Sequence, residues 1–213
     1  DNRSNRDWED LALGPCPEGI CLFVADVGDN ATAAPEVALL RLAEPTIDVD
    51  RSGDPLLLTL PADRLPFTYA EGPQDAEALV IEPDGTPVVL TKQGGASTRI
   101  YRLTGLDVDA PWVASDPVQI STARFGGPIS LGVTGADLWP DGSRMIVREY
   151  FDLQEFLLDG DVASATPDNA RTAPFAAEAQ GESVAYDAAN RRYLTVSEQA
   201  GGDAPIFEVR CAD

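Results

Sequence analysis

No histidine occurs anywhere among the 213 residues of this chain. That absence excludes a histidine general base, a Ser-His-Asp triad and any zinc site that needs an imidazole ligand. Basic residues are also scarce, since 15 Lys and Arg face 36 Asp and Glu and leave a formal charge of −21. Nucleic acids and anionic membranes bind basic surfaces, so neither is expected as a partner. Cations and basic groups are the expected ligands.

Long apolar runs are absent as well, and no stretch approaches the roughly 20 residues of a transmembrane span. With 44% hydrophobic residues the chain can still bury a substantial core, and we expect one domain over residues 1–213. The chain starts at Asp1, without an initiator Met or a signal peptide. We interpret that start as the result of maturation or truncation.

Only three cysteines are present. Cys16 and Cys21 flank Pro17 and Gly19, which can turn the chain and bring the two sulfurs together, so we predict a disulfide; a zinc pair is the alternative. A disulfide indicates an oxidising compartment, and the protein is therefore predicted to be extracytoplasmic, either periplasmic or secreted. Cys211 is left free, pairs with another chain, or has lost its partner.

One acidic phrase is present four times: WEDLALGP, AEALVIEP, GADLWPDG and GESVAYDA, which begin at Trp8, Ala76, Gly135 and Gly181. Two apolar runs with strand character follow each copy, and Asp84-Gly85 and Asp141-Gly142 separate such runs as hairpin turns. A repeat of this kind predicts an all-β fold with little helix, a β-propeller with four blade repeats, and a β-sandwich is the alternative. The repeats cover approximately 7–70, 71–130, 131–178 and 179–213.

The aligned phrases form two columns of candidate metal ligands. The first column is Glu9, Glu77, Ala136 and Glu182, and the second is Asp10, Ala78, Asp137 and Ser183. The first strand of each propeller blade lines the channel, so these carboxylates are expected to converge at one mouth. Oxygen ligands favour Ca²⁺ or Mg²⁺, and Ca²⁺ tolerates an irregular ring. The predicted metal ligands are therefore Glu9, Asp10, Glu77, Asp137 and Glu182. Alternatively, the acids accept backbone N–H bonds or pair with basic residues.

A further column follows the next apolar runs, with Asp26, Lys92, Arg148 and Ser197 at their ends. If Lys92 and Arg148 also face the channel, they form an acid-base ring with the carboxylates that needs no metal. Alternatively, they bind the phosphate or carboxylate group of a substrate beside a cation. The sequence leaves both interpretations open.

Five phrases carry a resemblance to a known family: DWEDLALGPC, CLFVADVGDN, DAEALVIEPDG, VTGADLWPDGSRMIVREY and QGESVAYD. Nearly the whole chain resembles a family of secreted or periplasmic bacterial β-propeller proteins, mostly of undefined activity. Members usually carry a further N-terminal blade, which leaves either a closed four-bladed ring or four blades of a five-bladed ring whose first part is cut off or lies in another chain. More distantly, the layout is similar to gluconolactonase-type and phytase-type propellers, whose inner-strand acids hold a divalent metal.

Three functions are compatible with these features. We favour a non-catalytic extracytoplasmic propeller that binds a protein partner or serves as a structural subunit, with Ca²⁺ in its channel. The alternative is a metal-dependent hydrolase of a phosphoester or lactone, in which the glutamates hold the metal and Lys92 or Arg148 binds the anion. In the third, the chain is a subunit of a larger assembly and a neighbour completes its ring.

Overall fold

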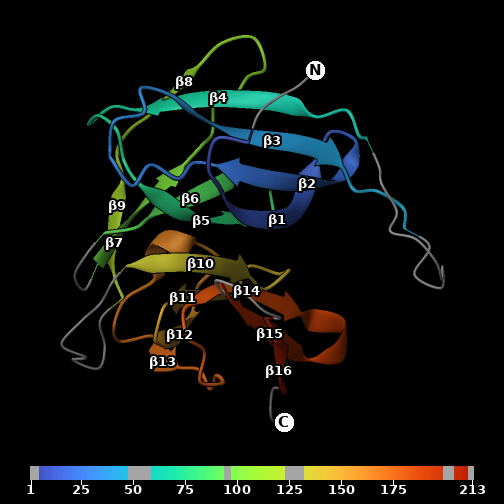
Figure 1. Ribbon diagram of the computed structural model, residues 1–213, viewed down its shortest axis with the longest axis vertical. Coiled ribbons are helices and arrows are strands. Elements are labelled where there is room, and N and C mark those ends of the chain that lie inside the picture. The colour runs from blue at the N-terminus through green and yellow to red at the C-terminus, as the bar shows by residue number, and fades with distance from the viewer. Residues whose placement is uncertain (1–4, 48–58, 94–96, 123–131, 199–203, 211–213) are drawn as a thin grey trace.

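A computed structural model describes residues 5–47, 59–93, 97–122, 132–198 and 204–210, and nearly all of the regular secondary structure within them is β-strand. The strands form four separate sheets, which are four propeller blades (Figure 1). The predicted all-β propeller with four blade repeats is thus confirmed. Cys211 lies outside the described residues, so its state stays a prediction.

Each blade is a sheet whose strands follow one another outward from the channel. The first contains β1 (Trp8–Cys16), β2 (Gly19–Asp26), β3 (Val37–Ala43) and β4 (Asp63–Tyr69). The second contains β5 (Ala76–Ile81), β6 (Pro87–Thr91), β7 (Ser97–Arg102) and β9 (Val118–Ser121). The third contains β10 (Val133–Leu138), β11 (Arg144–Glu149), β12 (Asp152–Leu157) and β13 (Ala170–Thr172), and the fourth β14 (Gly181–Asp187), β15 (Arg192–Ser197) and β16 (Ile206–Arg210).

One strand departs from this simple order. β8 (Trp112–Ala114) follows β7 in the chain but pairs in parallel with β4, so it adds a fifth strand to the first blade. The helical content of the described residues is two short 3-10 turns, η1 (Val162–Ser164) and η2 (Ala188–Asn190). Neither turn approaches the length that a membrane-spanning helix needs, and the described part of the chain contains no other helix.

Tight turns between the strands explain why the apolar runs fold back as hairpins. Asp84 accepts the Thr86 amide at 2.8 Å and Asp141 accepts the Ser143 amide at 2.9 Å. The glycine in each turn has a positive φ, +90° at Gly85 and +74° at Gly142, which side chains rarely tolerate. The Asp-Gly signals therefore mark the β5–β6 and β10–β11 connections, as the sequence predicts.

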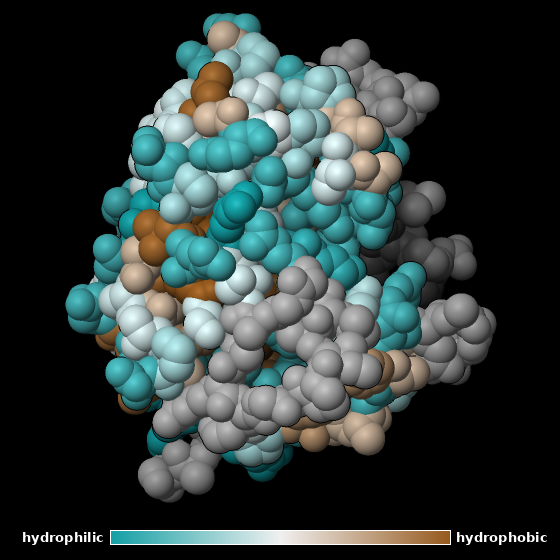
Figure 2. Space-filling model, turned by 90° about the vertical axis from the view of Figure 1, so that its left-hand side faces the viewer, coloured by the Kyte–Doolittle hydropathy of each residue, from teal (hydrophilic) through white to brown (hydrophobic). Residues whose placement is uncertain are grey.

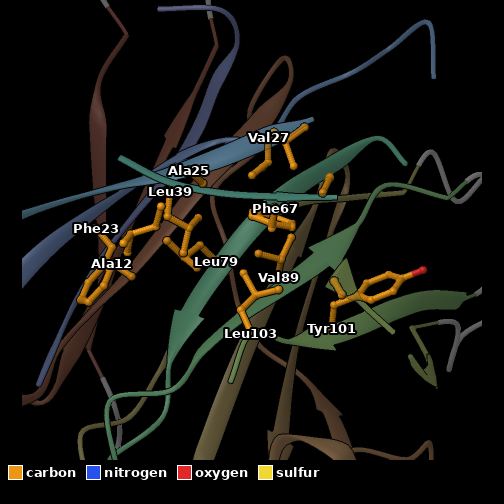
Figure 3. Close-up of a cluster of buried hydrophobic side chains, with 14 of the residues drawn as sticks. Ala12, Phe23, Ala25, Val27, Leu39, Phe67, Leu79, Val89, Tyr101 and Leu103 are labelled. Atoms are coloured by element: carbon orange, nitrogen blue, oxygen red, sulfur yellow. The ribbon is translucent and has the colours of Figure 1, made fainter. Parts of the chain in front are cut away.

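Apolar side chains fill the space between neighbouring blades. The largest cluster lies between the first and second blades and includes Phe23, Leu39, Phe67, Leu79 and Tyr101 (Figure 3). Further clusters join the second blade to the third and the third to the fourth. Among the described residues, β1 packs on β5, β5 on β10 and β10 on β14. This series brings the starts of four inner strands to the same end of the channel.

Cys16 and Cys21 form the predicted disulfide across the β1–β2 turn, with their Cα atoms 5.8 Å apart. Replacing both by serine is expected to lower the free energy of unfolding by roughly 2 kcal/mol, because the bridge restricts the unfolded chain over a short loop. Urea unfolding of both proteins measures the difference. A reductant should remove it, whereas equal stability without reductant would show that the bridge contributes nothing.

Candidate functional site

A β-bulge recurs near the start of every inner strand. Pairing shifts between Trp8 and Asp10, between Ala76 and Ala78, between Val133 and Gly135, and between Gly181 and Ser183. The extra residues at these four bulges are therefore Glu9, Glu77, Thr134 and Glu182. A bulge bends its strand and re-aims the side chain of the extra residue. The acidic repeat is therefore a repeated backbone feature that presents a glutamate in three blades of four.

Thr134 takes the glutamate position in the third blade, where the sequence alignment placed Ala136. The aligned position and the observed position differ by two residues, because the amino-acid sequence of the repeat does not reveal the bulge at Thr134. The Thr134 hydroxyl donates a hydrogen bond to the Gly181 carbonyl at 2.8 Å and is buried. The third blade thus uses this position to hold the fourth blade and offers no charge there.

The three bulge glutamates line one cavity of about 390 Å³ at the end of the channel where the inner strands begin. Strongly acidic and polar groups surround it. Its lining is Asp7, Trp8, Glu9, Asn30, Glu77, Lys92, Tyr150, Gln180, Glu182 and Glu198. The sequence predicts Glu9, Glu77, Glu182 and Lys92 at this mouth, and all four line the cavity.

The remaining lining residues could be found only in part from the sequence. Asp7 and Trp8 adjoin the first acidic phrase, and Gln180 directly precedes the fourth. Tyr150 directly follows β11, as Lys92 follows β6. Glu198 follows β15 in the same way, whereas Asn30 lies in a connection outside the repeated phrases and no repeat signal points to it.

Lys92 is the cation within this lining, and it is already engaged. Its ammonium group lies 2.5 Å from a Glu77 carboxylate oxygen and 2.7 Å from the Tyr150 hydroxyl. It also lies 4.8 Å from the centre of the Tyr150 ring. Burial lowers the pKa of Lys92, but the hydrogen bonds to Glu77 and Tyr150 outweigh that effect and raise it overall. Lys92 is therefore a permanent charge that joins the second and third blades.

One lysine does not neutralise the acids around it. Burial, together with the neighbouring Glu77 and Asp7 carboxylates, raises the pKa of Glu9 to about 8. Burial also raises the pKa of Glu77 to about 7, although Lys92 opposes the shift. Burial raises the pKa of Glu182, against a 2.6 Å hydrogen bond from Gln180. Charge on these carboxyls is costly, so a proton or a cation is favoured at the mouth.

Asp10 and Asp137 have a different role from the glutamates. An Asp10 oxygen accepts the backbone amides of Leu79 at 2.8 Å and Ala136 at 3.4 Å, which belong to the second and third blades. Asp137 accepts the Tyr186 amide of the fourth blade at 2.6 Å. Neither residue lines the acidic cavity. They join blades through the backbone, which is the alternative role that the sequence leaves open for these acids.

Arg148 also lies away from the acidic cavity. Arg148 pairs with Gly135, and the next residue, Glu149, pairs with Val133 at the end of β11. The Arg148 side chain is completely buried. Its guanidinium lies 3.6 Å from Glu178 and packs over the Phe175 ring at 4.8 Å. A β-carbon on Gly181 would lie 1.7 Å from the guanidinium, so only glycine fits there.

Metal sites require several ligand atoms close together. Among the described residues, the group of three whose ligand atoms all lie within 4.8 Å is Cys16, Glu18 and Cys21. Both of these sulfurs are in the disulfide, so the zinc alternative is wrong. Within the part of the chain that the structure describes, the carboxylates of the acidic cavity form no such group of three.

Comparisons with known proteins add little to this geometry. No family model and no curated protein matches the chain. Among solved structures, the chain is similar to the PQQ-bound form of an aldose sugar dehydrogenase from Streptomyces coelicolor, with a TM-score of 0.47 and 11% sequence identity. The match covers 94% of this chain and 93% of that one. The resemblance to a secreted or periplasmic family stays a prediction.

Proposed function

We propose that the protein is an extracytoplasmic propeller that acts as a binding or structural subunit and holds a divalent cation, Ca²⁺, at its acidic mouth. One observation carries the cation proposal: the same bulge occurs in three blades, and its extra residues, Glu9, Glu77 and Glu182, all line a single cavity. The raised pKa values of these carboxyls support it, because a bound cation offsets the cost of burying their negative charges beside other acids.

The extracytoplasmic location is supported by the disulfide between Cys16 and Cys21. Disulfides persist in oxidising compartments and are rare in the cytosol. The protein partner predicted from the sequence fits a chain of this kind, because propellers expose wide loop faces. A chain with a charge of −21 favours partners with basic surfaces.

The hydrolase alternative receives less support from the geometry. Of the two predicted anion-binding residues, Lys92 is bonded to Glu77 and Tyr150, and Arg148 is completely buried. Anion steering needs an accessible, uncommitted cation, and neither side chain offers one in this arrangement. Absence of calcium-stimulated hydrolysis of p-nitrophenyl phosphate and of a simple lactone is the expected result.

Calorimetric titration of Ca²⁺ into the metal-free protein tests the cation proposal. Glu77→Gln and Glu182→Gln should each weaken binding by roughly tenfold or more, since each removes a charge from the cavity. Glu44→Gln is a matched control, because Glu44 is exposed and lies outside the cavity. Equal affinity in all four proteins, or no binding by the unmodified protein, would remove the cation from the account.

A further inference from the structure

A second cavity lies between the first and second blades, at the end of their strands that is opposite the acidic mouth. Its volume is about 420 Å³, within the range of roughly 300–1,000 Å³ that is typical of small-molecule sites. The first blade contributes the β1–β2 turn and one side chain each from β2, β3 and β4. The second blade contributes the β5–β6 turn and the residues that follow β7. We call this cavity the inter-blade pocket.

Both turns at the inter-blade pocket are held in place. The disulfide joins Cys16 to Cys21 across the β1–β2 turn. Gly85 of the β5–β6 turn packs closely on that turn, since an added β-carbon would lie 2.9 Å from the Pro15 carbonyl oxygen. A pocket with fixed walls loses little conformational freedom when a ligand binds. The shape of the inter-blade pocket is therefore preformed.

The floor of the inter-blade pocket is apolar. Phe23, Leu65 and Leu103 line it and belong to the core cluster between the two blades, in which Figure 3 labels Phe23 and Leu103. Leu106 also lines the pocket and packs against the same cluster. By contrast, the side of the molecule that carries β7 and β9 is mostly hydrophilic (Figure 2). The pocket thus offers an apolar ligand group a surface away from water.

Two residues of opposite charge line the inter-blade pocket. Arg41 belongs to β3 of the first blade, and Asp84 belongs to the β5–β6 turn of the second. The Arg41 side chain is 22% exposed, and one of its nitrogens lies 2.7 Å from an Asp63 carboxylate oxygen. A guanidinium has five N–H donors, so this bond leaves donors for a ligand carboxylate. The pocket can therefore bind a negative group at Arg41 and a positive group at Asp84.

We infer that the inter-blade pocket binds a free apolar α-amino acid, with its carboxylate on Arg41, its ammonium group on Asp84 and its side chain on the apolar floor. A purely anionic ligand is repelled by Asp84 and by a chain with a charge of −21. A purely cationic ligand is repelled by Arg41. A zwitterion is neutral overall and complements both residues. An apolar amino acid combines these two charges with one apolar group.

Calorimetric titration with four small molecules tests the inference. L-leucine and L-phenylalanine should both bind saturably. The two matched analogues of phenylalanine each lack one charge, since 3-phenylpropionate has no ammonium group and 2-phenylethylamine has no carboxylate. Each analogue should bind at least tenfold more weakly than L-phenylalanine. Absence of saturable binding of both amino acids, or equal affinity for L-phenylalanine and either analogue, would overturn the inference.

Variants of the charged residues locate the binding. Arg41→Gln should weaken the binding of L-phenylalanine at least tenfold. Arg64→Gln is the matched control, because Arg64 lies on the neighbouring strand β4, also pairs with an acid, Glu36 at 2.9 Å, and lies outside the pocket. The control should bind L-phenylalanine as the unmodified protein does. Equal affinities in the Arg41→Gln and Arg64→Gln variants would contradict the role of Arg41.

Two further variants test the ammonium position and the cavity itself. Asp84→Asn keeps an oxygen for the Thr86 amide, so the turn is retained. It should weaken the binding of L-phenylalanine but not that of 3-phenylpropionate, and an equal effect on both would contradict the pairing with Asp84. Thr104→Trp, at an exposed residue of the lining, should fill the pocket and abolish binding. Thermal unfolding close to that of the unmodified protein confirms that each variant folds.

The amino-acid pocket is independent of the cation proposed for the acidic mouth. Among the described residues, the two cavities share no lining residue. Titration of L-phenylalanine with and without EDTA should therefore give the same affinity. A failed calcium titration with intact binding of L-phenylalanine removes only the cation. Intact calcium binding without saturable binding of either amino acid removes only the amino-acid pocket.

Discussion

Replacing Asp10 by alanine is expected to lower the free energy of unfolding by roughly 3 kcal/mol. The Asp10 carboxyl accepts the Leu79 and Ala136 amides of two other blades, and both of those residues are buried. A buried amide that loses its acceptor costs about 1–3 kcal/mol. Urea unfolding at pH 6 measures the effect. Asp10→Asn keeps one side-chain oxygen as acceptor and should lose less than half as much.

The matched control for this loss is Asp84→Ala. Asp84 also accepts a backbone amide, from Thr86, but it does so in an exposed hairpin turn where water replaces the lost bond. A change of about 0.5 kcal/mol is expected there. Similar losses at Asp10 and Asp84 would show that Asp10 is an ordinary turn acid and that the blades do not depend on it.

The free energy of unfolding is expected to fall as the pH rises from about 4 to 9. Burial raises the pKa of Glu9 and Asp10 to about 8 and that of Glu77 to about 7. A carboxyl with a raised pKa binds its proton more tightly in the folded state than in the unfolded state. Its stabilising contribution is therefore complete below about pH 4 and is lost through the folded pKa.

Glu9 and Glu77 should together account for a loss on the order of 3 kcal/mol between pH 5 and pH 9, because solvent screens the half-buried mouth and its carboxyls share protons. Exposed acids act in the opposite direction. Hydrogen bonds lower the pKa of Asp84, Asp141 and Asp187, so their contributions are lost as the pH falls below about 4. Maximal stability is thus expected near pH 4–5, in thermal unfolding at constant ionic strength.

Glu9→Gln removes the mouth carboxyl on which burial and neighbouring acids act together. The variant should be more stable than the unmodified protein at pH 9 and nearly equal to it at pH 5, where Glu9 is already protonated. A stability maximum at pH 7–8, or a Glu9→Gln effect that is the same at both pH values, would contradict the raised pKa values.

The sequence predicts the architecture well because the architecture depends on patterns of residue types that can be read directly from the sequence. Alternating apolar runs and Asp-Gly turns give the hairpins, and Pro17 and Gly19 give the disulfide turn. The acidic phrase marks the inner strand of each blade, and three of its glutamates do share a cavity. These features are local or repeat along the chain.

Features that depend on register are less visible. The bulge in β10 places Thr134 where alignment suggested Ala136, since an extra residue in one strand leaves no mark on composition. Arg148 lies two residues before the position that corresponds to Lys92, which Tyr150 occupies, and it packs on Phe175 instead of lining the mouth. The pairing of β8 with β4 joins strands that are distant in the chain.

The most direct test of the bulge glutamates as a cation site is thermal unfolding with and without Ca²⁺ at two pH values. At pH 8, a Ca²⁺ concentration about 100 times the Kd should raise the Tm by roughly 5 °C, because the cation replaces the proton that Glu77 has lost and that Glu9 has partly lost. At pH 5 those carboxyls keep their protons, and the shift should nearly vanish. A Ca²⁺ shift that is absent at pH 8, or equally large at pH 5, would contradict the account.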